Sequence, residues 1–152
     1  MANIDVRTGR GVIMPREQVL ERIADVLRRH PELVSFDPLD EKYESMVMRC
    51  KTDPGPSHAE RDGWEGCVCD WYFGSYTMTD QDTGELVTLP SLALVTTDGR
   101  LVRLTNSEPA VRSWLAILRE IGAERVQRGL NILVSLRPSQ TAGRHYWVIL
   151  PA

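Results

Sequence analysis

The sequence lacks any hydrophobic run long enough to span a membrane. Its apolar stretches fall short of the roughly 18 residues that a spanning helix needs. The first residues, MANIDVRTGRGVIMPREQ, lack the hydrophobic segment of a secretory signal. We therefore expect a soluble, cytoplasmic protein with no membrane partner. Cysteine is also scarce, since Cys50, Cys67 and Cys69 are too few for a disulfide framework, in agreement with a reducing compartment.

The sequence motifs of catalysis are absent as well. There is no glycine-rich phosphate loop, no His-Glu-x-x-His, no Gly-x-Ser-x-Gly and no acidic pair spaced for two-metal chemistry. The histidines, His30, His58 and His145, are scattered along the chain. The sequence thus predicts a protein that is not an enzyme and that needs no cofactor.

Four side chains have the chemistry of metal ligands: Cys50, His58, Cys67 and Cys69. However, Cys-x-Cys on an extended strand holds its two sulfurs too far apart for easy tetrahedral coordination. Buried thiols that behave as small hydrophobic groups are the better interpretation. No metal site is predicted, and zinc binding remains the alternative.

Lysine is nearly absent, with only Lys42 and Lys51. Residues 1–99 contain 10 basic and 18 acidic residues, whereas residues 100–152 contain 8 basic and 3 acidic residues, so the net charge changes from −8 to +5. Every basic residue of the second segment is an arginine, and the planar guanidinium suits phosphate recognition. Either this segment binds phosphates, or arginine simply replaces lysine throughout the chain. The sequence leaves both interpretations open.

At 152 residues the chain has the size of one ordinary domain, and its strongest local signals lie between Gly84 and Gly122. Apolar residues recur at every second position on both sides of Asp98-Gly99, which predicts a β-hairpin with a tight turn. A helix follows, since Ser107 or Asn106 can cap its first turn and Gly122 can end it. Between them, apolar residues return at steps of three and four: Val111, Trp114, Leu115, Leu118 and Ile121.

The first part of the chain, residues 1–62, is predicted to be a helical arm followed by a loop. Pro15 begins a helix that runs to Arg29 and carries one apolar stripe. Residues 37–49 predict a short second helix, and residues 51–63, with two prolines and two glycines, predict a loop. The stripe packs either on the rest of the chain or on a partner, and packing within the chain is favoured.

The second part, residues 63–152, is predicted to be a β-rich domain. Residues 64–80 read as a long strand that bends or bulges at Gly74. Residues 130–136 and 145–150 read as two further strands, after a connector at 123–129. With the hairpin and its helix, the order is three strands, one helix and two strands. We therefore predict an α+β, mainly β fold: a five-stranded OB-like barrel preceded by the N-terminal helical arm.

This second part also resembles single-stranded-DNA-binding proteins of phages and mobile elements. The likeness covers about residues 63–152. It rests on the order of elements, the turns in TGELVTLPSLALVTTDGRLVRLTNS, the helix PAVRSWLAILREIG and the ending GRHYWVIL. It implies an OB-fold that binds single-stranded DNA during DNA replication. The acidic tail with which bacterial relatives of such proteins usually end has no counterpart after the last predicted strand.

An OB-fold binds single strands by stacking bases on aromatic rings while basic side chains follow the phosphates. Alternation places Tyr72 and Tyr76 on one face of the long strand, together with Val68 and Asp70. The other face is expected to hold Cys67, Cys69, Trp71 and Phe73. The predicted nucleic-acid-binding residues are Tyr72, Tyr76, Arg100, Arg103, Arg137, Arg144 and Trp147.

Two alternatives accompany this prediction. Each of the aromatic residues can instead belong to the core. Arg103 is expected to lie outside the core if its neighbours Val102 and Leu104 lie inside. A protein-interaction module that assembles a larger complex, or a homo-oligomer that forms through the Pro15–Arg29 helix, is the second interpretation of function.

Overall fold

The computed structural model describes residues 15–141 and 143–152. Its five strands form one antiparallel sheet in the order β3-β2-β1-β4-β5. The strands are β1 (Glu65–Thr79), β2 (Leu86–Thr96), β3 (Leu101–Thr105), β4 (Leu130–Pro138) and β5 (His145–Pro151). The predicted α+β class is confirmed. The sheet does not close into the predicted OB-like barrel, because in the described part of the chain β3 and β5 each pair with one neighbour only.

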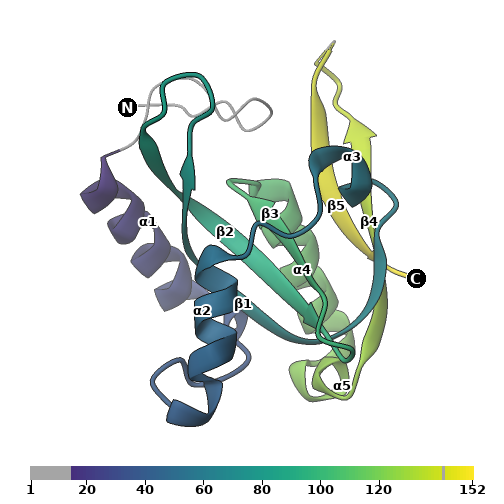
Figure 1. Cartoon of the computed structure of the whole chain (residues 1–152). Helices are drawn as coiled ribbons and strands as arrows, with labels where there is room; N and C mark the ends of the chain where they lie inside the picture. The colour runs from purple at the N-terminus through teal and green to yellow at the C-terminus, as the bar shows by residue number, and fades with distance from the viewer. Residues whose placement is uncertain (1–14, 142) are drawn as a thin grey trace.

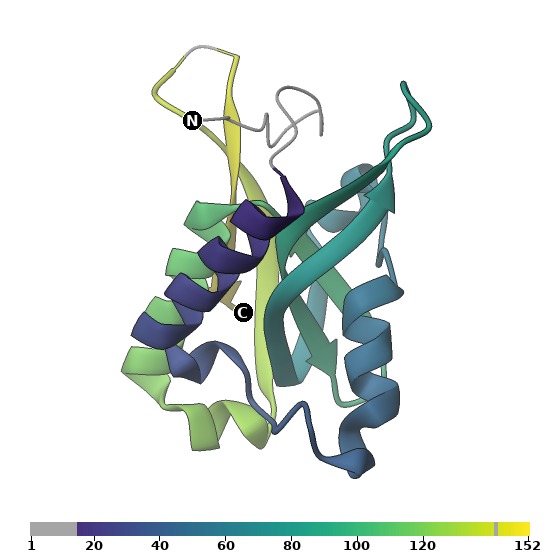
Figure 2. The same cartoon turned by 90° about the vertical axis from the view of Figure 1, so that its left-hand side faces the viewer.

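Helices cover both faces of this sheet. The main core lies between the sheet and α1 with α4, and a smaller core lies on the opposite face, beside α2; Figures 1 and 2 show these layers. The α-helices are α1 (Arg16–Arg29), α2 (Glu44–Thr52), α3 (His58–Arg61), α4 (Glu108–Ile121) and α5 (Ala123–Gln127). Two 3₁₀ turns, η1 (Pro31–Leu33) and η2 (Glu41–Tyr43), join α1 to α2.

The tight turn and the helix that the sequence predicts between Gly84 and Gly122 are confirmed. Gly99 has φ +85° in the turn between β2 and β3, and its amide donates to the carbonyl oxygen of Thr96 at 3.0 Å. The Ser107 hydroxyl accepts a hydrogen bond from the Ala110 amide at the start of α4. Gly122 ends that helix with φ +92°, a backbone conformation that glycine adopts without strain.

The N-terminal helix packs within the chain, as favoured from its stripe. Val19 and Ile23 of α1 and Leu33 of η1 lie in the same core as Trp71 of β1 and Trp114 of α4. The two indole rings meet edge to face, with 5.5 Å between their centroids, an arrangement that aromatic pairs prefer. The described part of the N-terminal segment is therefore built into the core of the sheet.

The first strand has its bulge at Cys69 and not at Gly74. The pairing of β1 with β2 shifts register between Val68 and Asp70, so the sides on which residues lie change there. Val68 consequently joins Trp71 in the main core, and the predicted grouping of Val68 with Tyr72 is wrong. Gly74 stays in register, and a Cβ atom there would lie 2.4 Å from Cε1 of Tyr72. Glycine therefore makes room for the tyrosine ring.

The segment from Asp53 to Arg61 accounts for the open sheet. Its first residues run beside β3, since the Asp53 carbonyl accepts a hydrogen bond from Nε of Arg103, and a Cβ atom on Gly55 would lie 3.3 Å from the Leu101 carbonyl oxygen. Its last residues form α3, where the His58 ring packs against Trp147 of β5. The segment thus crosses from one sheet edge to the other (Figure 1). It occupies the place where β3 and β5 would meet in a closed barrel.

Burial of Cys50 makes the free energy of unfolding fall as the pH rises above about 9. The thiol is buried in the smaller core. That burial raises its pKa from 9.0 to about 11, in spite of the nearby positive charge of Arg103. The folded state therefore keeps the thiol neutral where the unfolded chain would ionise it. This stabilisation is complete below about pH 9 and is lost as the pH rises toward 11, at about 1.4 kcal/mol per pKa unit.

We expect wild type to lose about 2 kcal/mol more unfolding free energy than Cys50→Ala between pH 8 and pH 11, measured by urea denaturation at both values. Burial also raises the pKa values of Cys69 and Tyr72, and these groups act in the same direction in both proteins. Only the difference between the two proteins therefore reports on Cys50. Equal losses in wild type and variant would contradict the prediction.

Candidate nucleic-acid interface

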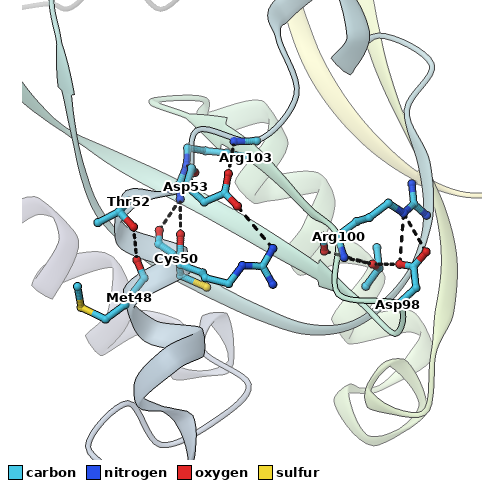
Figure 3. Close-up of polar contacts among 10 residues, drawn as sticks. Met48, Cys50, Thr52, Asp53, Asp98, Arg100 and Arg103 are labelled. Atoms are coloured by element: carbon cyan, nitrogen blue, oxygen red, sulfur yellow. Dashed lines mark hydrogen bonds and ion pairs between the residues drawn. The ribbon is translucent and has the colours of Figure 1, made fainter.

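Arg103 is a buried structural residue, contrary to the expectation that it is exposed. Its side chain lies on the face of β3 opposite the main core, as predicted, but only 1% of its surface is accessible, because α2 and the segment after it cover that face. The guanidinium donates to Ser91 Oγ and to the Asp53 carbonyl, each at 2.8 Å, and to the Cys50 carbonyl at 2.6 Å. Figure 3 shows Arg103 beside Cys50 and Asp53.

These contacts place a cation at the carboxyl end of α2. The last carbonyl groups of a helix lack partners within it and carry a partial negative charge. Arg103 donates to two of these carbonyls, that of Cys50 and that of Arg49, which also accepts the Asp53 amide at 2.9 Å. It covers the ring of Tyr76, with 4.0 Å from its guanidinium carbon to the ring centroid. Burial lowers the pKa of Arg103. The residue fixes α2 to the sheet, and its side chain is not accessible to a phosphate.

The three predicted aromatic residues are buried or half-buried in the fold, which is the alternative that the sequence left open. Tyr76 is buried beneath Arg103. Tyr72 is half-buried and stacks on Phe36, with ring centroids 5.9 Å apart. Trp147 belongs to the main core and is covered by His58 and by the guanidinium of Arg61, 5.3 Å from its ring centroid. Tyr76 and Trp147 are almost wholly buried and Tyr72 is half-buried, so none of the three stands on the open surface as the predicted stacking group.

Arg100 is exposed but holds the β2–β3 turn together. Its Nε lies 3.0 Å from a carboxylate oxygen of Asp98, and its guanidinium carbon lies 5.2 Å from the centroid of the Trp64 ring. It also donates to the Glu65 carbonyl at 3.2 Å. Figure 3 shows it with Asp98, away from Arg103. The carboxylate of Asp98 offsets the charge of Arg100. We therefore expect Arg100 to attract a phosphate less strongly than an arginine without an acidic neighbour.

The remaining predicted residues, Arg137 and Arg144, are exposed, and both belong to the β4–β5 hairpin. Arg137 lies directly opposite Tyr146 in the strand register, so the two side chains share one face. Tyr146 is 37% exposed and was not among the predicted binding residues. Alternation predicts that Tyr146 and Trp147 lie on opposite faces of β5. It does not predict which of the two faces the core.

Charge distinguishes the β4–β5 hairpin from the other long hairpin. From Arg125 to the last residue the sequence contains no aspartate or glutamate. The β1–β2 turn, by contrast, contains Asp80, Asp82 and Glu85. Both hairpins project from the same end of the molecule (Figures 1 and 2). A polyanion approaching that end is attracted by the β4–β5 hairpin and repelled by the β1–β2 hairpin.

A hollow of about 230 Å³ opens beside the basic hairpin. It is bounded by α3, by the first residues of α4 and by the ends of β4 and β5. Its lining residues carry two imidazoles, two hydroxyls (Ser107 and Tyr146) and otherwise apolar or aromatic groups. The lining residues are His58, Ser107, Pro109, Leu136, His145, Tyr146 and Trp147.

Comparisons with protein-family models, with curated proteins and with solved structures found no match. Within residues 15–141 and 143–152, no three His, Cys, Asp or Glu side chains lie close enough together to hold a metal ion. Cys50, His58, Cys67 and Cys69 therefore do not form the cluster that zinc would need. None of the described helices has the length and hydrophobicity required to cross a bilayer.

Proposed function

We propose that this protein binds single-stranded nucleic acid, with DNA as the expected form, through the β4–β5 hairpin and without catalysing a reaction. The observation that carries the proposal is the exposed Arg137–Tyr146 pair on a hairpin free of acidic residues. A tyrosine ring can stack on a base of any sequence, while an adjacent guanidinium binds the phosphate. Arg144 in the hairpin loop adds a second cation.

The OB-like fold that the sequence predicts is in keeping with this proposal. OB-folds are five-stranded, partly open structures that bind oligonucleotides with the face of strands 2 and 3 and with the loops between strands 1 and 2 and between strands 4 and 5. Here α2 covers the face that carries Arg103, and the first of those loops is acidic. The loop between β4 and β5 is the OB-type surface that stays both basic and accessible.

We expect Arg137→Ala to weaken binding of a fluorescein-labelled oligo-dT and to lower the salt slope of the binding constant by about 0.7, because one phosphate contact is lost. Tyr146→Ala should weaken binding by about 5-fold or more, since base stacking is worth about 1–3 kcal/mol, with an unchanged salt slope. Fluorescence anisotropy at several salt concentrations measures both quantities.

Arg119→Ala is the matched control, because Arg119 is an exposed arginine on α4. It removes the same charge from the protein but should change the salt slope much less. A duplex of the same sequence should bind more weakly than the single strand. Absence of oligo-dT binding by wild type at low salt would sink the proposal.

A protein-interaction module is the second candidate, on a separate observation. Leu39 is 90% exposed and lies with Met48 in a hollow of about 430 Å³ that also contains Asp40, Glu41 and Glu44. An exposed apolar pair ringed by carboxylates suits a basic, partly apolar protein segment. Size-exclusion chromatography with light scattering tests this candidate. A strict monomer with no copurifying partner would count against it.

A further inference from the structure

We infer that the hollow between α3, the start of α4 and β5 takes one unstacked nucleobase of the bound strand. The inference rests on the proposed function and adds to it a site that recognises a base. The hollow adjoins the basic hairpin, since Tyr146 and His145 of that hairpin contribute to its lining. Its volume of about 230 Å³ is below the 300–1,000 Å³ of pockets for drug-sized ligands, and suits a single planar ring system.

The hollow has aromatic groups against which a base can pack. The His58 ring meets Trp147 edge to face, with centroids 5.2 Å apart, so the indole is held from the side of α3. Tyr146, the next residue along β5, also contributes to the lining. Pro109 and Leu136 supply further apolar surface. Packing between such groups strengthens binding by about 5-fold or more per base.

Polar groups of residues that line the hollow can match the hydrogen-bonding edge of a base. The Ile149 amide donates to Ser113 Oγ of α4 at 2.9 Å, so it points away from β4. Alternate residues of a strand direct their amides to the same side, and those of Trp147 and His145 therefore also point away from β4. Ser107 Oγ accepts from the Ala110 amide, which leaves its hydroxyl proton free to donate. Carbonyl and ring-nitrogen acceptors of a base fit such donors.

The charges around the hollow favour a strand that enters it from the hairpin. Leu136 pairs with Trp147 and Arg137 pairs with Tyr146 across the two strands. The side chain of Arg137 therefore lies on the other face of the hairpin from Leu136 and Trp147, which line the hollow. No acidic side chain is among the described residues of its lining. A strand whose base enters the hollow would have its phosphates beside a hairpin that has no acidic residue to repel them.

The test compares oligo-dT with an abasic strand of the same length, which has the phosphates but no bases. Pro109→Trp fills the hollow from the first turn of α4. We expect it to lower the affinity for oligo-dT by about 5-fold or more and to leave the affinity for the abasic strand unchanged. Ala116→Trp is the matched control, because Ala116 is exposed on the same helix and does not line the hollow. It should change neither affinity.

His58→Trp fills the hollow from α3 and supplies the same test if Pro109→Trp does not fold, as judged by circular dichroism. Unchanged oligo-dT affinity in a folded filling variant would overturn the base site while the proposed function stands. An equal loss for both strands would overturn it as well, because the variant would then have disturbed phosphate contacts. Failure of wild type to bind either strand at low salt would instead overturn the proposed function, and the base site with it.

Discussion

Arg103→Ala should lower the free energy of unfolding by at least about 3 kcal/mol. The substitution leaves the carbonyls of Cys50 and Asp53 and the hydroxyl of Ser91 without their donor. Each buried polar group that loses its partner costs about 1–3 kcal/mol. It also removes the cation that covers Tyr76 and opens a cavity beside α2. Urea denaturation followed by circular dichroism measures the change.

Two variants make this prediction specific. Arg103→Lys keeps the charge but lacks the planar fork that reaches several acceptors at once, so it should recover only part of the lost stability. Arg100→Ala removes an exposed arginine whose ion pair with Asp98 is accessible to water, and exposed ion pairs contribute less than about 1 kcal/mol. If Arg103→Ala cost no more than Arg100→Ala, the structural role of Arg103 would be disproved.

Val19→Asp should destabilise the whole sheet, by about 3 kcal/mol or more. Val19 of α1 is 0% exposed in the main core. A carboxylate there either stays charged without a partner or takes up a proton, and both outcomes cost free energy. Because α1 and the strands share one core, unfolding should remain a single transition at a lower urea concentration. Far-ultraviolet circular dichroism and tryptophan fluorescence should report the same midpoint.

The neighbouring residue supplies the control. Leu20 is 46% exposed on the same helix, so Leu20→Asp should cost much less. The predicted division into an arm at residues 1–62 and a domain at 63–152 leads to a different result. An independent arm would let Val19→Asp loosen α1 while the strands kept their stability, giving two separate transitions. That outcome would show that the shared core contributes little to the sheet.

The elements best predicted from the sequence are those whose cause is local. The Asp98-Gly99 turn, the Ser107 cap and the Gly122 stop depend on backbone conformations and hydrogen bonds within a few residues. Such preferences act in any tertiary context. The short helix α3 also had a local signal, because Ser57 and Glu60 form a capping box. It was missed because four residues show no apolar period.

At the Cys69 bulge, the rule that alternate residues of a strand share one face fails. Alternation correctly grouped Trp71 with Phe73, since both lie in the main core after the bulge. It wrongly placed Val68 with Tyr72, since the extra residue reverses the sides on which residues before it lie. Nothing in the run GCVCDWYF marks Cys69 as the extra residue. Its position is set by pairing with β2.

The sequence by itself determined the strands, the long helices and the clustering of arginine in the last third. Only the tertiary structure decided which arginines and aromatic rings remain accessible. Arg103 and Arg137 both lie on strands. Arg103 is covered by the segment that contains Asp53, 50 positions earlier in the chain, whereas Arg137 lies on an exposed hairpin. Alternation tells which residues share a face of a sheet. Whether that face meets water depends on contacts between distant segments, which local spacing does not encode.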